Sequence, residues 1–218
     1  MSDALDSPGA MELERLSRAL ASLRMPALAR LTKGAASGKT PISIYLTLLE
    51  EARLLDISDG LGTAADFQRR FNGYYGVRRN AVWRQQFYRY FEQAKLYDGS
   101  PIALFEEVLS KLYGATNRVE ASFVSKLEGT LRPTCPIIDS VVRDFLSRHL
   151  PELPNPKGLD GAGAFYRWLN RAMDDLSKTS PAVDWFDEFD ETFAALPSAF
   201  SISNVKKLDF LIWGGTER

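Results

Sequence analysis

Asp139 is the carboxylate of this chain whose surroundings best suit chemistry. It lies in the stretch TCPIIDSVV at residues 134–142, three positions after Pro136 and among apolar residues. A carboxylate at the start of a helix can accept backbone N–H groups and is stabilised by the helix dipole. The same carboxylate in a cleft can stabilise positive charge on a sugar whose base is leaving. The stretch therefore predicts either a helix cap or a catalytic aspartate.

A second candidate feature is the basic aromatic stretch at residues 67–90, FQRRFNGYYGVRRNAVWRQQFYRY, which has six arginines and no acidic residue. Arginine binds phosphate bidentately, and aromatic rings can stack on unstacked bases. The expected nucleic-acid-binding residues are Tyr74, Tyr75, Arg78, Arg79, Trp83 and Arg84. The alternative is a solvated arginine face on a helix over residues 80–97, whose core side would carry Val82 and Phe87.

These residues must be positioned by helices, because nearly every periodic segment has apolar residues spaced by three and four. Ser100 and Pro101 are typical of a helix start before the run that begins at Ile102, and Ser203 precedes the last run. We expect an all-α fold, a multi-helix orthogonal bundle, in which two helical halves could share a cleft. The chain is interpreted as a single helical domain over residues 1–218, and a subdivision would fall near the loop at residues 151–163.

Two further segments, residues 32–41 and 71–80, are rich in glycine or asparagine and are expected to be loops. The first contains GAASGKT, which is similar to a phosphate-binding P-loop. That motif needs four residues between its glycines and a strand before the first glycine. Here only three residues separate the two glycines, and a helical pattern precedes them. We therefore expect an inter-helix loop and no nucleotide site.

Composition narrows the classes of function. The 218 residues include 27 Lys and Arg against 28 Asp and Glu, so attraction to nucleic acid must come from local patches. Cys135 and His149 are the only residues of their kinds, which excludes a disulfide framework, a four-cysteine cluster and a zinc site built on His and Cys. We expect no metal and no cofactor. No apolar run approaches the roughly 18 residues of a membrane span, and the polar start MSDALDSPGA favours a cytoplasmic protein.

Two segments resemble the helix-hairpin-helix DNA glycosylase superfamily. The stretch SFVSKLEGTLRPTCPIIDSVVRDFLSRHL at residues 122–150 is similar to its lysine-bearing helix and the "V-D-x-x-V" start of the next helix. The closing KKLDFLIWGG, with Leu208, Asp209 and Trp213, is similar to its terminal "L-D-x-x-L-W" helix. The resemblance implies an enzyme that excises a damaged or modified base from DNA. It also implies that Asp139 is the catalytic aspartate and that Lys126 is the lysine that forms a Schiff base in bifunctional members.

Two departures from the superfamily keep other functions open. No glycine lies between Glu120 and Ser125, where the superfamily brings bare backbone N–H groups to a DNA phosphate. Lys126 also precedes Asp139 by only 13 positions, so a surface lysine with its stem along apolar residues is the alternative. The competing functions are an inactive helical nucleic-acid-binding or regulatory module and a helical protein-interaction domain. An enzyme requires Asp139 to line an open cleft that the basic aromatic stretch shares. No pattern indicates an oligomeric state.

Overall fold

The fold is all-α, as expected. The computed structural model describes residues 8–196 and 202–216, and these residues contain helices and no strand. Residues 1–7, with which the polar N-terminal segment begins, lie outside the described residues. The helices are α1 (Ala10–Leu31), the 3₁₀ helix η1 (Ala35–Ser37), α2 (Pro41–Leu54), α3 (Gly62–Tyr75), α4 (Ala81–Ala94), α5 (Pro101–Thr116), α6 (Ala121–Leu131), α7 (Ser140–His149), α8 (Gly158–Ser177), α9 (Ser180–Thr192) and α10 (Asn204–Gly215). None of the helices in this described part is long and apolar enough to cross a membrane.

Local capping explains where many of these helices begin. The side chains of Thr40, Asn80, Ser100 and Ser203 each accept a hydrogen bond from a backbone N–H in the first turn of the helix that follows. Pro101 occupies the first turn of α5, where its missing N–H costs nothing. The predicted starts at Ser100 and Ser203 are confirmed.

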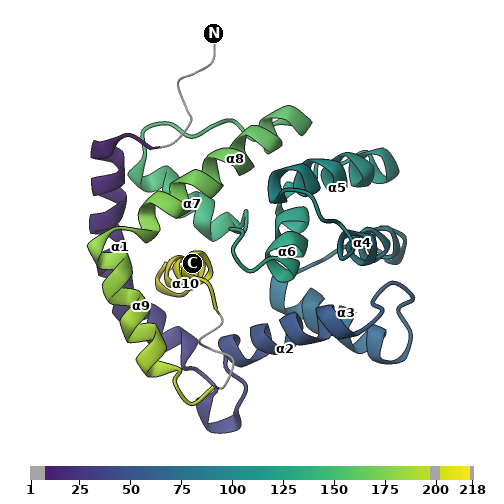
Figure 1. Ribbon diagram of the computed structural model, residues 1–218, viewed down its shortest axis with the longest axis horizontal. Coiled ribbons are helices and arrows are strands. Elements are labelled where there is room, and N and C mark those ends of the chain that lie inside the picture. Colours follow the sequence, from purple (N-terminus) through teal and green to yellow (C-terminus); the bar gives the residue numbers. More distant parts are fainter. Residues whose placement is uncertain (1–7, 197–201, 217–218) are drawn as a thin grey trace.

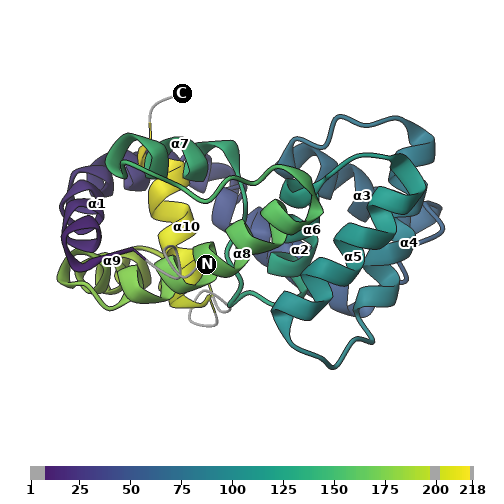
Figure 2. The ribbon, with the colours of Figure 1, turned by 90° about the horizontal axis from the view of Figure 1, so that it is seen from above.

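The helices form two groups that lie side by side in Figure 2. The terminal group consists of α1 and α7–α10, in which α10 packs against all four other helices. The middle group consists of α2–α6, and Figure 1 shows it on the opposite side of α10 from α1 and α9. The chain passes between the groups at residues 32–40 and 132–139. The loop at residues 151–157 joins α7 to α8, which packs against α5 of the middle group as well as against α1, α9 and α10.

Close packing of α10 against α1 depends on two glycines at the end of α10. A Cβ atom at Gly215 would lie 2.6 Å from the backbone oxygen of Leu23, and one at Gly214 would lie 3.0 Å from the Cα of Ala27. Only glycine lets the two backbones approach this closely. The α10 helix, which carries part of the candidate site, is therefore held at a fixed depth against α1.

The basic aromatic stretch differs locally from expectation. The segment at residues 71–80 is not a loop throughout, because α3 continues to Tyr75 and ends at Gly76, whose φ of 65° is left-handed. On α4, Phe87 is buried as expected, but Val82 is not. Val82 is 71% exposed, and Trp83 is buried instead, because Trp83 precedes Phe87 by four residues and shares its helix face, whereas Val82 precedes it by five.

Candidate active site

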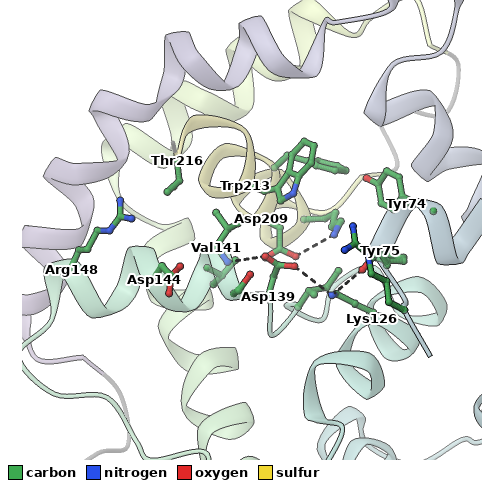
Figure 3. Close-up of a pocket in the computed structure, with 18 residues that line it drawn as sticks. Tyr74, Tyr75, Lys126, Asp139, Val141, Asp144, Arg148, Asp209, Trp213 and Thr216 are labelled. Atoms are coloured by element: carbon green, nitrogen blue, oxygen red, sulfur yellow. Dashed lines mark hydrogen bonds and ion pairs between the residues drawn. The ribbon is translucent and has the colours of Figure 1, made fainter. Parts of the chain in front are cut away.

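A pocket of about 760 Å³ lies between the terminal and middle groups. The end of α3 and the helix α6 contribute one wall, and α7 and α10 contribute the other (Figure 3). Its lining includes Tyr74, Tyr75, Lys126, Asp139, Asp209 and Trp213. The site is thus built from segments that are far apart along the chain.

Asp139 and Lys126 meet in this pocket. Asp139 is the N-cap of α7, and its Oδ1 accepts a hydrogen bond of 2.8 Å from the backbone nitrogen of Val141. Its Oδ2 lies 3.5 Å from the Nζ of Lys126, which also donates to the backbone oxygen of Tyr75 at 3.3 Å. The Lys126 side chain is 7% exposed, so the alternative of a surface lysine does not fit. Capping therefore uses one carboxylate oxygen of Asp139 and leaves the other facing the amine (Figure 3).

Close packing of residues 135–137 against α6 brings the side chains of Asp139 and Lys126 together. A Cβ atom at Gly129 would lie 3.0 Å from Ile137 Cγ1 and 3.3 Å from the backbone oxygen of Cys135. The bare glycine lets residues 135–137 run against α6 before α7 begins. This arrangement places the start of α7 beside the face of α6 that carries Lys126.

A second ion pair, whose residues were not among the expected site residues, borders the pocket from α10. Lys206 Nζ lies 3.3 Å from Asp209 Oδ2, and both side chains are about 5% exposed or less. Burial raises the pKa of Asp209 to about 6, against the opposing effect of the Lys206 charge, and the charge of Asp139 also raises it. Burial lowers the pKa of Lys206, which Asp209 partly offsets. A signal was present, because Lys206 and Asp209 are spaced by three residues and so share one face of a largely apolar helix.

Aromatic rings supply the apolar part of the pocket. Tyr74 and Tyr75 lie with their ring centroids 4.8 Å apart at an angle of 87°, and the Tyr75 hydroxyl lies 3.3 Å from Thr130 Oγ1. Burial raises the pKa of both phenols above the ordinary value, so both stay neutral at physiological pH. Trp213 is partly exposed on the opposite wall, and the Arg30 guanidinium carbon lies 5.8 Å from its ring centroid.

The structure separates the arginines that the sequence grouped together. Arg78 is exposed and lines the pocket with Tyr74 and Tyr75. Arg79 instead forms an ion pair with Glu120, and Arg84 is half-buried on α4. Trp83 is 5% exposed and stacks on Phe87, so its ring faces are occupied by the core rather than open to a base. Tyr74, Tyr75 and Arg78 are therefore the members of the predicted binding set that share the pocket of Asp139 and Lys126.

Comparison of the chain with protein-family models, with curated proteins and with solved structures finds no match. Among residues 8–196 and 202–216, no three His, Cys, Asp or Glu side chains lie close enough together to hold a metal ion.

Proposed function

We propose that this protein is a DNA glycosylase-like enzyme that excises a damaged or modified base from DNA. The observation that carries the proposal is the 3.5 Å approach of Lys126 Nζ to Asp139 Oδ2 at the edge of a pocket between two helical groups. An amine and a carboxylate in one concave site are groups that cleavage of an N-glycosidic bond can use.

The chemistry assigns a role to each of the two side chains. As the bond between the base and the sugar C1′ breaks, its electron pair leaves with the base, and positive charge develops on the sugar. The Asp139 carboxylate, held by the Val141 N–H, stabilises that charge. Lys126 gives a proton to the departing base and its neutral amine then adds to C1′, after which Asp139 accepts the proton of the new ammonium group.

The rest of the pocket supports a nucleotide as the ligand. Its volume of about 760 Å³ lies within the range of small-molecule sites, roughly 300–1,000 Å³. Tyr74, Tyr75 and Trp213 offer neutral aromatic surface to a base that has been turned out of a duplex. Arg78, on the same rim, offers a guanidinium to the strand that carries that base.

One observation favours a second candidate function, an inactive helical nucleic-acid-binding module. The turn between α5 and α6 contains no glycine, and its Glu120 is buried against Arg79. A chain that kept the pocket but lost this backbone anchor would bind nucleic acid without releasing a base.

The experiment that tests the proposal is a base-release assay on purified protein. Duplexes that each carry one damaged or modified base are incubated with the protein, and alkali-labile sites are then scored. We expect release of at least one base from the panel. Binding to these duplexes without release of any base would favour the inactive module instead.

A further inference from the structure

A second, smaller pocket adjoins the candidate active site. Its volume is about 370 Å³, and it lies where the start of α4 meets the end of α5 and the turn after it. Arg78 lines this pocket and the larger one, so the two share a rim. We refer to the smaller pocket as the arginine pocket, because Arg78, Arg79 and Arg118 all line it.

The arginine pocket has an excess of positive charge. No aspartate or glutamate lines it, and its other polar side chains include those of Asn80 and Gln86. Arg78 and Arg118 are exposed, and within the described residues neither guanidinium has an ion-pair partner. Two uncompensated guanidinium groups from different segments of the chain therefore border one hollow.

Arg79 is the fixed member of the arginine pocket. Its Nε and Nη2 donate to the two carboxylate oxygens of Glu120, each at 3.0 Å. Its guanidinium carbon lies 5.0 Å from the ring centroid of Phe123 on α6. The buried Glu120 thereby ties the segment that carries Arg78 to the turn that carries Arg118. This pairing holds the two exposed arginines near each other before any ligand arrives, which reduces the entropy lost on binding.

We propose that the arginine pocket is a binding site for a backbone phosphate of the nucleic acid whose base occupies the larger pocket. Guanidinium groups bind phosphate oxygens bidentately, and a phosphate would neutralise the charge that Arg78 and Arg118 leave uncompensated. The shared rim at Arg78 suits a ligand in which base and phosphate are joined through one sugar. This inference rests on the proposed function only in taking nucleic acid as the ligand of the larger pocket.

Binding of a labelled single-stranded DNA oligonucleotide, measured by fluorescence anisotropy at several salt concentrations, tests the inference. Arg118→Ala should weaken binding about tenfold, because a charge-assisted contact is lost. It should also lower the slope of log affinity against log salt by roughly 0.7, the value for one phosphate contact on a single strand. Arg118→Glu should weaken binding further. Both variants should keep the thermal stability of the wild type, since Arg118 is exposed.

The matched control is Arg89→Ala, which removes an exposed arginine of α4 that lies outside the lining of the arginine pocket. It should change the affinity less than twofold, as expected for a surface position. An equal loss of affinity in Arg89→Ala and Arg118→Ala would mean that general surface charge causes the effect, and it would overturn the inference.

Three further probes identify the ligand. An oligonucleotide with an uncharged methylphosphonate backbone should bind much more weakly, and equal binding would overturn a phosphate site. Inorganic phosphate should compete only at far higher concentration than DNA, and competition at equal concentration would indicate a free-phosphate site. A polyglutamate peptide that competed as well as DNA would point to an acidic protein partner and also overturn the inference. Because every readout is binding, a protein that releases no base but responds to Arg118→Ala still supports the phosphate site.

Discussion

The side-chain oxygen of Ser125 accepts a hydrogen bond of 2.8 Å from the backbone nitrogen of Ile138, and both groups are buried. Ser125 precedes Lys126 on α6, and Ile138 precedes Asp139 at the start of α7. This one bond therefore fastens the two segments together next to the candidate catalytic pair. It explains how an interval of 13 positions between Lys126 and Asp139 still brings their side chains within 3.5 Å.

Ser125→Ala should destabilise the protein by about 1–3 kcal/mol, because the buried N–H of Ile138 would lose its acceptor. Urea denaturation measures the loss. Ser147→Ala is the matched control, since its hydroxyl donates to the backbone of Asp144 on the exposed side of α7. The control should stay within about 0.5 kcal/mol of the wild type. Equal stability of both variants would mean that the Ser125 bond does not hold the site together.

Asp139→Asn should abolish base release and leave the fold intact. Asparagine caps a helix about as well as aspartate, so the change removes the charge and keeps the hydrogen bond to Val141. Loss of charge stabilisation in the transition state should slow release about a hundredfold or more. Single-turnover rates and thermal melts of both proteins provide the measurement. A variant that releases the base at the wild-type rate would show that Asp139 is only a cap.

Lys126 should form a covalent bond to abasic DNA. Its amine would add to the C1′ aldehyde with loss of water, and borohydride would reduce the resulting imine to a stable secondary amine. We expect a trapped protein–DNA adduct with the wild type and none with Lys126→Ala, scored by gel mobility. Lys207→Ala is the control, because Lys207 is similarly buried but pairs with Asp190. An adduct that persists in Lys126→Ala would place the reactive amine elsewhere.

Glu128 should make the folded state less stable as the pH rises. Burial raises the pKa of Glu128 from 4.5 to about 7, although the Arg132 guanidinium, 3.6 Å away, opposes the shift. Between pH 4.5 and 7 the folded state therefore binds more protons than the unfolded state, so the free energy of unfolding falls as the pH increases. The slope from one such group is at most about 1.4 kcal/mol per pH unit. Above pH 7 its effect is constant.

Glu128→Gln should remove this contribution. Urea denaturation of wild type and variant between pH 4 and 8, roughly the window of the shift, should show a shallower decline for the variant. Arg132 still donates to the backbone oxygen of Tyr97 at 2.7 Å, so the substitution leaves it with a partner. Parallel curves for the two proteins would contradict a raised pKa at Glu128.

Gly215→Ala should destabilise the protein by about 1–3 kcal/mol, because the new Cβ would overlap the backbone of α1 at Leu23. Gly114→Ala is the control within α5, where a Cβ has nothing within 4 Å. It should stabilise the protein by about 0.5–1 kcal/mol, since alanine loses less entropy in a helix. Thermal melts of the two variants check the expected loss of stability in Gly215→Ala and the expected gain in Gly114→Ala. A melting temperature of Gly215→Ala at or above that of the wild type would rule out the close approach of α10 to α1.

Several features of this protein could be predicted from the sequence because they depend on neighbouring residues. Apolar spacing of three and four predicted the all-α fold, and Ser100, Ser203 and Asp139 were correctly expected to stand at helix starts. Each cap involves a side chain and an N–H two or three residues away, so its energetics are local. The expectation for Val82 was wrong because it lies five residues before Phe87, whereas a strict spacing of three and four selects Trp83.

The site depended on the tertiary structure. Sequence spacing left Lys126 either at the surface or beside Asp139, and only the packing of residues 135–137 against α6 brought the two together. The same holds for Arg79, whose charge is compensated by Glu120, 41 positions away. The ion pair of Lys206 and Asp209 was visible as a pattern, but its place in the pocket wall required α10 to lie between the middle group and helices α1 and α9. These contacts join residues distant in sequence, and their formation depends on how whole helices pack rather than on any local preference.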